Sequence, residues 1–437
     1  MSSALIDRAL KEGASYAELF SYELASAEAA IRGYSAELNM SRSRLFSLRA
    51  LYEGCWGVSS SLKPSSRLVE AAIAAARRAQ LSARRRLRLA SRRPAQGSHL
   101  AVGEGPTKVA EGASAEVISS FKEVEGRVRF MEAVVTATRV GRAMMSSDGV
   151  NSYELRDLVD VSVSVVGEGG VVASACTGWS GPAPRGWEDE VRATVSRAVE
   201  RLEAKSRAKL LNPLLRGSKF KVILVGEAAC AFIHEAVGHL LEADVLIEHG
   251  YRLPSRLGPE ELTVHDDPTL PHGYGSYAFD DEGVEARRKP LVDKGRLVSL
   301  LHTRWTAAEL GVEPTGNGRG VFTAPKSMAS NLVVDRGTWT LDEMVEETDE
   351  GFYVEGVVKA EVRGGVVSIA PDVAWYVRRG EVVEPVVLEE VRLPIIKALG
   401  SIDAVGRAGF THRPCSERGL NVSEVAPPMR LSWAYVS

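Results

Sequence analysis

From about Gly273 onward, apolar and polar residues alternate along most of the chain, and glycines interrupt the alternation at short intervals. Successive side chains of a β-strand point to opposite faces, so such alternation is typical of strands with one buried face. Glycine turns between these strands favour antiparallel neighbours. The sequence shows no repeating strand–helix–strand pattern of the kind that builds a parallel sheet. It therefore predicts an α+β protein with antiparallel sheets, most clearly at residues 282–302, 351–385 and 429–436.

The first 212 residues mix helical and strand-like patterns. The basic segment 205–221 contains Pro213 and Gly217, and we interpret it as a linker. We therefore predict two domains, an N-terminal mixed α/β domain at 1–212 and a C-terminal domain at 213–437 that is rich in antiparallel sheet. In the first domain the patterns predict helices at 3–12, 65–80, 114–123 and 187–205, and strands at 17–32, 44–60, 128–144 and 158–176.

Bulk properties narrow the class of protein. The formal charge is −3 for 437 residues, which indicates neither a nucleic-acid nor a membrane partner. No apolar run reaches the roughly 18–20 residues of a membrane helix. The N-terminus lacks a basic segment followed by an apolar one, so we expect no signal peptide. A hydrophobic fraction of 45% allows a sizeable core. The cysteines are widely spread, which predicts a reducing cytoplasm; they are Cys55, Cys176, Cys230 and Cys415.

The stretch "GEAACAFIHEAVGHLLEADVLIEHG" at 226–250 almost contains a zinc-protease signature. His234 and Glu235 are in place, but the second histidine, His239, comes five residues after the first instead of four. Residues five apart lie about 140° from each other on an α-helix, so they cannot face one ion. A π-turn, or loosening of the helix at Gly238, would bring them together. The alternative is an ordinary buried helix with two hydrogen-bonded histidines.

Glu235 favours a metal site, because zinc peptidases place their general base directly after the first histidine. Such a carboxylate takes a proton from the water that zinc activates. Catalytic zinc has three protein ligands and one open position. Spacing does not choose the third ligand among the nearby and distant candidates; these are Cys230, Glu242, Asp244, His249, His265, His272, His302, His412 and Cys415.

Several blocks of the chain together resemble the TldD/PmbA family of metalloproteases, specifically its TldD branch. Their order and spacing agree over most of the chain, and the N-terminal half agrees more loosely, in "GASYAELF" and "FSLRALYEGCWGVSSS". The more specific blocks are "HEAVGHLLEAD" at 234–244, "GYGSYAFDDEG" at 273–283, "PTGNGRG" at 314–320 and "GRAGFTHRPCSERGL" at 406–420. The resemblance implies that His234, His239 and Cys415 bind Zn²⁺ and that Glu235 is the catalytic base.

The resemblance also implies a function. This function is that of a zinc-dependent peptidase that hydrolyses short or unfolded peptides. The resemblance further implies that the peptidase works as a homodimer or pairs with a PmbA/TldE-like subunit, and that its active site lies in the C-terminal domain. The alternative is a non-catalytic subunit that binds peptides or a partner. The intact H-E-x-x-x-H motif and Cys415 argue against that alternative, because a pure partner has no use for Glu235.

Two further groups of residues have two interpretations each. Asp280, Asp281 and Glu282 either hold a metal-binding histidine or cap a hairpin turn. Arg319, in "TGNGRG", either steadies a peptide carboxylate or belongs to a tight glycine turn.

Overall fold

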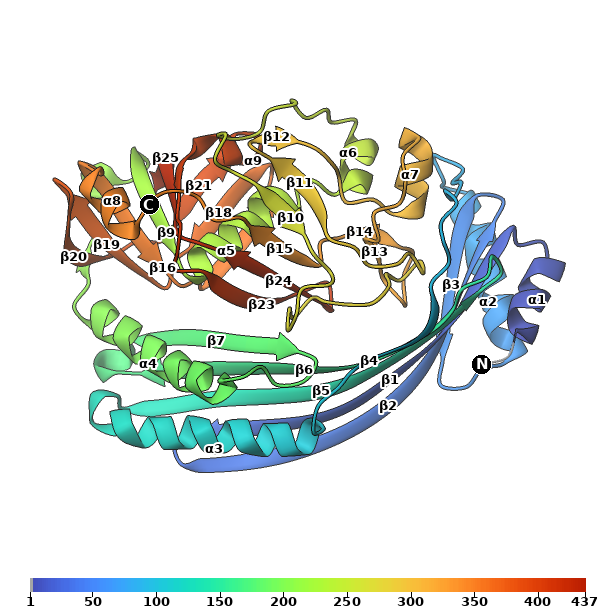
Figure 1. The fold of residues 1–437 in the computed structure, drawn as a ribbon, viewed down its shortest axis with the longest axis horizontal. Helices are drawn as coiled ribbons and strands as arrows, with labels where there is room; N and C mark the ends of the chain where they lie inside the picture. The colour runs from blue at the N-terminus through green and yellow to red at the C-terminus, as the bar shows by residue number, and fades with distance from the viewer. Residues whose placement is uncertain (1–2) are drawn as a thin grey trace.

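The computed structural model describes residues 3–437. Its N-terminal half is built on a seven-stranded sheet in the order β3-β2-β1-β5-β6-β4, and β7 pairs with the remaining part of β6. The four longest strands have 16 to 18 residues each and curve together around the C-terminal half (Figure 1). The strands are β1 Tyr16–Arg32, β2 Ser35–Tyr52, β3 Cys55–Ser61, β4 Gln96–Ala101, β5 Phe130–Ser146, β6 Asn151–Val166 and β7 Val172–Ser180.

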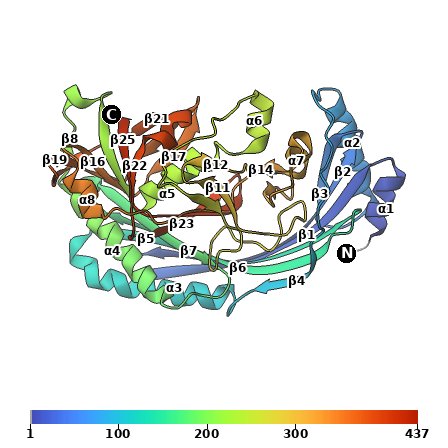
Figure 2. The same ribbon diagram turned by 45° about the horizontal axis from the view of Figure 1, so that its top comes forward.

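Helices cover the outer face of this curved sheet. Two lie at each end, namely α1 Ala4–Lys11 with α2 Ser66–Gln80, and α3 Pro106–Val124 with α4 Trp187–Ser206 (Figures 1 and 2). Alternate residues of the strands pack against these helices; in β1 they are Ala27, Ala29 and Ile31. The other residues of each strand face the hollow side, where the C-terminal half lies.

Two of the predicted strands were wrong in extent, because each runs through a turn. The segment 158–176 contains the turn between β6 and β7, where Gly169 and Gly170 have positive φ. The segment 44–60 contains the turn between β2 and β3 at Glu53 and Gly54, which also have positive φ. The predicted helix 114–123 begins earlier, at Pro106, which occupies the first helical position where proline is favoured.

The C-terminal half has a six-stranded sheet, β12-β11-β10-β15-β24-β23, and a ten-stranded sheet, β17-β18-β21-β25-β9-β16-β19-β20-β8, in which β22 pairs with β25. Most pairs are antiparallel, and a few, such as β9 with β16, are parallel. The fold is thus α+β, as predicted. The strands are β8 Lys209–Leu210, β9 Lys219–Val225, β10 Val264–Asp266, β11 Lys289–Asp293, β12 Arg296–Leu297, β13 Gly318–Arg319, β14 Lys326–Ser327, β15 Asn331–Val334, β16 Glu350–Glu355, β17 Lys359–Arg363, β18 Val366–Ala370, β19 Val373–Arg378, β20 Glu381–Val387, β21 Val391–Pro394, β22 Ile402–Val405, β23 Thr411–Glu417, β24 Leu420–Ala426 and β25 Met429–Val436.

Helix α5 Glu227–Ile233 is the centre of this half. It contacts strands of both large sheets, and all of its residues are buried. A helix that is apolar on every side can only be stable inside a core. The other helices are α6 Ala243–His249, α7 Arg304–Leu310, α8 Leu341–Glu346 and α9 Ile395–Ala398. Among residues 3–437, no helix is long and apolar enough to cross a membrane. The domain boundary at 212/213 stays a prediction.

The two halves meet through the β23–β24 hairpin and a group of buried charges. Strand β23 lies on β7, where a Cβ atom at Gly178 would come within 3.2 Å of the Pro414 ring. Arg142 of β5 is hydrogen-bonded to Asp281 of the C-terminal half. Asp280 accepts hydrogen bonds from the backbone N–H groups of Glu282 and Val284, so it caps a turn, and among residues 3–437 no histidine is hydrogen-bonded to it.

Candidate metal centre

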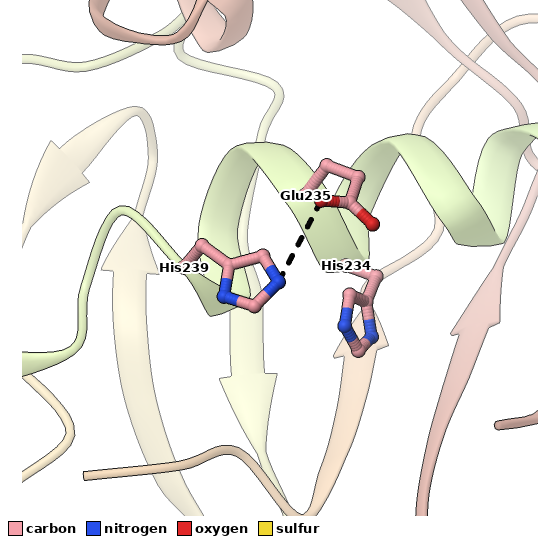
Figure 3. Close-up of side chains that lie close together, drawn as sticks. All are labelled: His234, Glu235 and His239. Carbon is pink, nitrogen blue, oxygen red and sulfur yellow. Dashed lines mark ion pairs between the residues drawn. The ribbon is translucent and has the colours of Figure 1, made fainter. Parts of the chain in front are cut away.

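Directly after α5, the helix widens into a π-turn, His234–Gly238. The N–H of His239 donates to the carbonyl oxygen of His234 at 3.3 Å, a bond that spans five residues. The two imidazole rings therefore lie on the same side of the helix, with centroids 5.2 Å apart (Figure 3). Gly238 is not among the glycines with positive φ. The π-turn is thus the device that brings the histidines together, and the helix is not an ordinary α-helix there.

Each imidazole is oriented by a carboxylate at its Nδ1 atom. His234 Nδ1 lies 2.6 Å from an oxygen of Glu424, and His239 Nδ1 lies 3.1 Å from an oxygen of Glu242. Both carboxylates are buried. Glu424 is held in turn by Arg413 at 3.1 Å. A carboxylate at Nδ1 fixes the tautomer that leaves Nε2 free to bind a metal ion, as is usual for histidine ligands of zinc.

Two more carboxylates approach the same space. Glu235 Oε2 lies 3.6 Å from His239 Nε2, and Glu417 Oε2 lies 3.7 Å from His234 Nε2. Figure 3 shows Glu235 above the gap between the histidines. Within the described residues, Glu235 Oε2 and Glu417 Oε1 are buried oxygens without a hydrogen-bond donor. Burial raises the pKa of Glu235, although the neighbouring histidines and Arg413 lower it, so this carboxylate is a stronger base than usual.

The hairpin brings Cys415 to His234. The ligand atoms of His234, Cys415 and Glu424 lie within 4.8 Å of one another, as do those of His234, Glu235 and His239. Cys415 and His239 belong to different groups, and His234 is a member of each of these two groups. Cys230 does not take part: its buried Sγ lies 3.2 Å from the carbonyl oxygen of Thr411.

These donors fit a zinc ion. Two imidazoles with free Nε2 atoms, a nearby thiol and buried oxygens without donors form a site that attracts a soft divalent cation. Burial lowers the pKa of His239, but the carboxylates of Glu242, Glu417 and Glu235 outweigh it and raise the pKa to about 8. Burial and the charge of Glu424 raise the pKa of the Cys415 thiol to about 11. A metal ion would replace these protons, because its ligands must be deprotonated.

The remaining sequence candidates lie elsewhere. Asp244 accepts from the backbone N–H groups of Val245 and Ser327, His302 contacts Thr306, and His265 contacts Asp335. Sequence reasoning did not find Glu424 or Glu417. Glu417 follows Cys415 by two residues on one strand, so both side chains point to one face. That spacing was a usable signal. No such signal marks Glu424, because its position depends on the pairing of β23 with β24.

Replacing Glu424 by glutamine should lower zinc affinity about 10- to 100-fold, the usual effect of losing the partner of a metal-binding histidine. Glutamine keeps the size of the side chain but removes the charge that holds His234 and Arg413. Competition with a chromophoric chelator measures the affinity. Glu70→Gln, an exposed glutamate on the outer helix α2, serves as the control. An unchanged affinity in Glu424→Gln would show that this carboxylate does not orient His234.

Comparisons with known proteins concern the family and the fold of the chain. Residues 217–437 match the family described as the PmbA/TldA metallopeptidase C-terminal domain. A metalloprotease of Methanocaldococcus jannaschii is 38% identical over 216 residues, or 47% of each chain. A zinc metalloprotease TldD homolog of Saccharolobus solfataricus is 31% identical over 214 residues, or 47% of this chain and 48% of the relative. The chain thus matches about half the length of these curated relatives.

Solved structures show the same fold over the whole chain. TldE from Thermococcus kodakarensis superposes with a TM-score of 0.77 at 16% identity, covering 100% of this chain and 99% of that one. A protein from Thermotoga maritima gives the same TM-score at 18% identity, with the same coverage of both chains. At these identities the likeness concerns the fold alone. The family match over the half that carries the π-turn, His234 and Cys415 shows that the chain belongs to the PmbA/TldD metallopeptidase family.

Proposed function

We propose that this protein is a zinc-dependent peptidase that hydrolyses short or unfolded peptides. The observation that carries the proposal is the π-turn, which aligns His234 and His239. Beside them, Glu235 keeps a buried oxygen that has no hydrogen-bond donor among residues 3–437. His234, His239 and Cys415 are the proposed zinc ligands. This donor set leaves one coordination position open, as catalytic zinc sites do.

The chemistry divides between the ion and the chain. When bound, zinc supplies Lewis acidity, which lowers the pKa of water from about 15.7 toward about 7 and polarises a peptide carbonyl. Glu235 accepts the proton of the attacking water and passes it to the leaving amine. Its raised pKa suits both steps, since a general base works best with a pKa near the working pH. Glu424 and Glu242 hold the imidazoles in place throughout.

An extended peptide suits the surroundings of the site. Strand β23, which carries Cys415, is the last strand of the six-stranded sheet. An edge strand binds extended chains through backbone hydrogen bonds, with little demand on their sequence. This supports short or unfolded peptides as substrates.

Metal removal tests the proposal. The purified protein should contain about one zinc ion per chain and cleave an unstructured peptide. A chelator should abolish cleavage, and added zinc should restore it. Metal content is measured by mass spectrometry and cleavage by peptide mapping. A protein that holds zinc and binds the peptide, yet never cleaves it, would instead favour the non-catalytic subunit. The fold shared with TldE is the observation that favours this second candidate.

We also propose that the protein works in the cytoplasm as a homodimer or with a PmbA/TldE-like subunit. Four free cysteines support the location, and the likeness to TldE supports such a partner. The large sheets have edge strands that an interface would cover. We expect at least a dimer by sedimentation at micromolar concentration, alone or with the partner subunit. A monomer that retains full activity would contradict this expectation.

A further inference from the structure

A cavity of about 260 Å³ lies between the hollow face of the N-terminal sheet and the C-terminal half. Strands β1, β5 and β6 form one wall, and the turn of the β23–β24 hairpin forms part of the other. Leu420, at this turn, pairs with Glu417, two residues beyond Cys415. Tyr274 also lines the cavity; burial and the charges of Asp160 and Cys415 raise the pKa of its phenol. The cavity is therefore next to the proposed zinc site.

The cavity has more positive than negative side chains. Three arginines line it, Arg142, Arg156 and Arg319, but only two carboxylates, Glu154 and Asp281. Glu154 pairs with both Arg142 and Arg156 at 3.0 Å, and Asp281 also binds Arg142. Asp281 also forms a longer ion pair with Arg319, so two arginines share it and the three arginines face only two carboxylates.

Arg319 is buried without a carboxylate of its own. Its side chain is 7% exposed, and its nearest carboxylate oxygen, on Asp281, is 4.0 Å from Nε. Its terminal nitrogens donate to the carbonyl oxygens of Ala329 and Asn421, both at 3.3 Å, and its Nε has no acceptor among the described residues. Asp280, which lies nearby, accepts hydrogen bonds from the backbone N–H groups of Gly318, Glu282 and Val284.

A buried charge whose only carboxylate partner is 4.0 Å away and shared is costly, and a ligand of opposite charge would offset that cost. Arginine is also the side chain best shaped to bind a carboxylate with two hydrogen bonds. The ring of Tyr277, 4.6 Å from the guanidinium, holds it in place. The cavity is too small for a folded domain but has room for the end of a peptide.

Resting on the proposed function, we propose that this cavity binds a carboxylate of the peptide substrate, supplied by its free C-terminus. Cleavage would then remove a short C-terminal fragment. The same chemistry is offered by an Asp or Glu side chain close to the end of a peptide, and the two sources can be separated by experiment.

Binding measured in the Glu235→Gln protein tests the proposal without relying on cleavage. The probes are one unstructured peptide with a free C-terminus, its C-terminal amide, its N-acetyl form, and an amide whose last residue is Glu. We expect amidation to weaken binding at least about tenfold, as for the loss of a buried charged hydrogen bond. N-acetylation should change nothing. Recovery by the Glu-containing amide would retain the carboxylate site but identify a side chain as its source.

Arg319→Gln, combined with Glu235→Gln, should bring the affinity ratio of free to amidated peptide close to one, and Arg319→Lys should retain part of it. Arg287→Gln, an exposed arginine outside the cavity, is the matched control and should keep the ratio. Equal binding of free and amidated peptides, or a ratio that survives Arg319→Gln, would overturn the proposal. If the wild type cleaves nothing while the binding preference is present, the proposed function fails and the cavity assignment stands.

Discussion

Replacing Glu235 by glutamine will slow peptide cleavage at least about a hundredfold, while zinc and peptide remain bound. The carboxylate lies beside the two histidines, and in the part of the chain that the structure describes no donor is hydrogen-bonded to its buried Oε2. Glutamine has the same shape but cannot accept the proton of water. General-base catalysis contributes about 10²–10⁴-fold, so the loss should appear in kcat rather than in binding.

The measurement needs zinc content, peptide affinity and the cleavage rate of the same preparation. Glu417→Gln is the matched control, because Glu417 is also a carboxylate at the site, partly buried, but stands on the hairpin. The zinc content of the Glu417→Gln protein shows how the loss of a nearby negative charge alone changes zinc binding. Cleavage by Glu235→Gln at the wild-type rate would leave Glu235 without a role as base.

Replacing Cys415 by serine will lower zinc affinity by more than about a hundredfold, because loss of a ligand costs more than loss of a ligand's partner. A hydroxyl group is a much poorer zinc ligand than a thiolate. Cys415 is the thiol whose Sγ lies within 4.8 Å of the ligand atoms of His234 and Glu424. Zinc retained after dialysis and chelator competition both report the effect.

Cys230→Ser is the control for this experiment. Cys230 stands on α5, four residues before His234, but its Sγ contacts backbone carbonyl groups in the core. The Cys230→Ser protein should keep its zinc, although burying a hydroxyl group at this position should lower the stability of the fold. Full zinc in Cys415→Ser with loss in Cys230→Ser would show that the ligand assignment is wrong.

The sequence predicted those features that depend on local spacing. Alternation predicted the antiparallel sheets, whereas the five-residue spacing of His234 and His239 left a π-turn, a helix loosened at Gly238 and an ordinary helix all open. It missed the turns at Glu53–Gly54 and Gly169–Gly170, since strand patterns continue on both sides of them. Spacing alone did not choose Cys415 over the other thiols and histidines; only the family resemblance did.

The surroundings of the site could not be predicted, because they depend on contacts between distant segments. Glu424 meets His234 across 190 positions of the sequence, through the pairing of β23 and β24 and their packing on α5. That Arg319 shares its only carboxylate, Asp281, with Arg142 becomes apparent only after every carboxylate in the cavity has been matched with its partners. Composition, with a net charge of −3, gives no sign of a local positive excess.

The position of the hairpin couples metal binding to the packing of the two halves. Cys415 stands on a strand that touches the N-terminal sheet, and the close contact of Pro414 with Gly178 leaves that strand little room to move. A zinc ion held by the histidines at the end of α5 and by Cys415 of this hairpin would link the two elements. Its binding would stabilise their packing by mass action. At a free zinc concentration of 100 times Kd, the bound ion would stabilise the packing of the hairpin on this helix by about 2.7 kcal/mol. The proposed catalytic ion is thus also a thermodynamic clamp that holds the helix with the π-turn to the hairpin on which the N-terminal sheet packs.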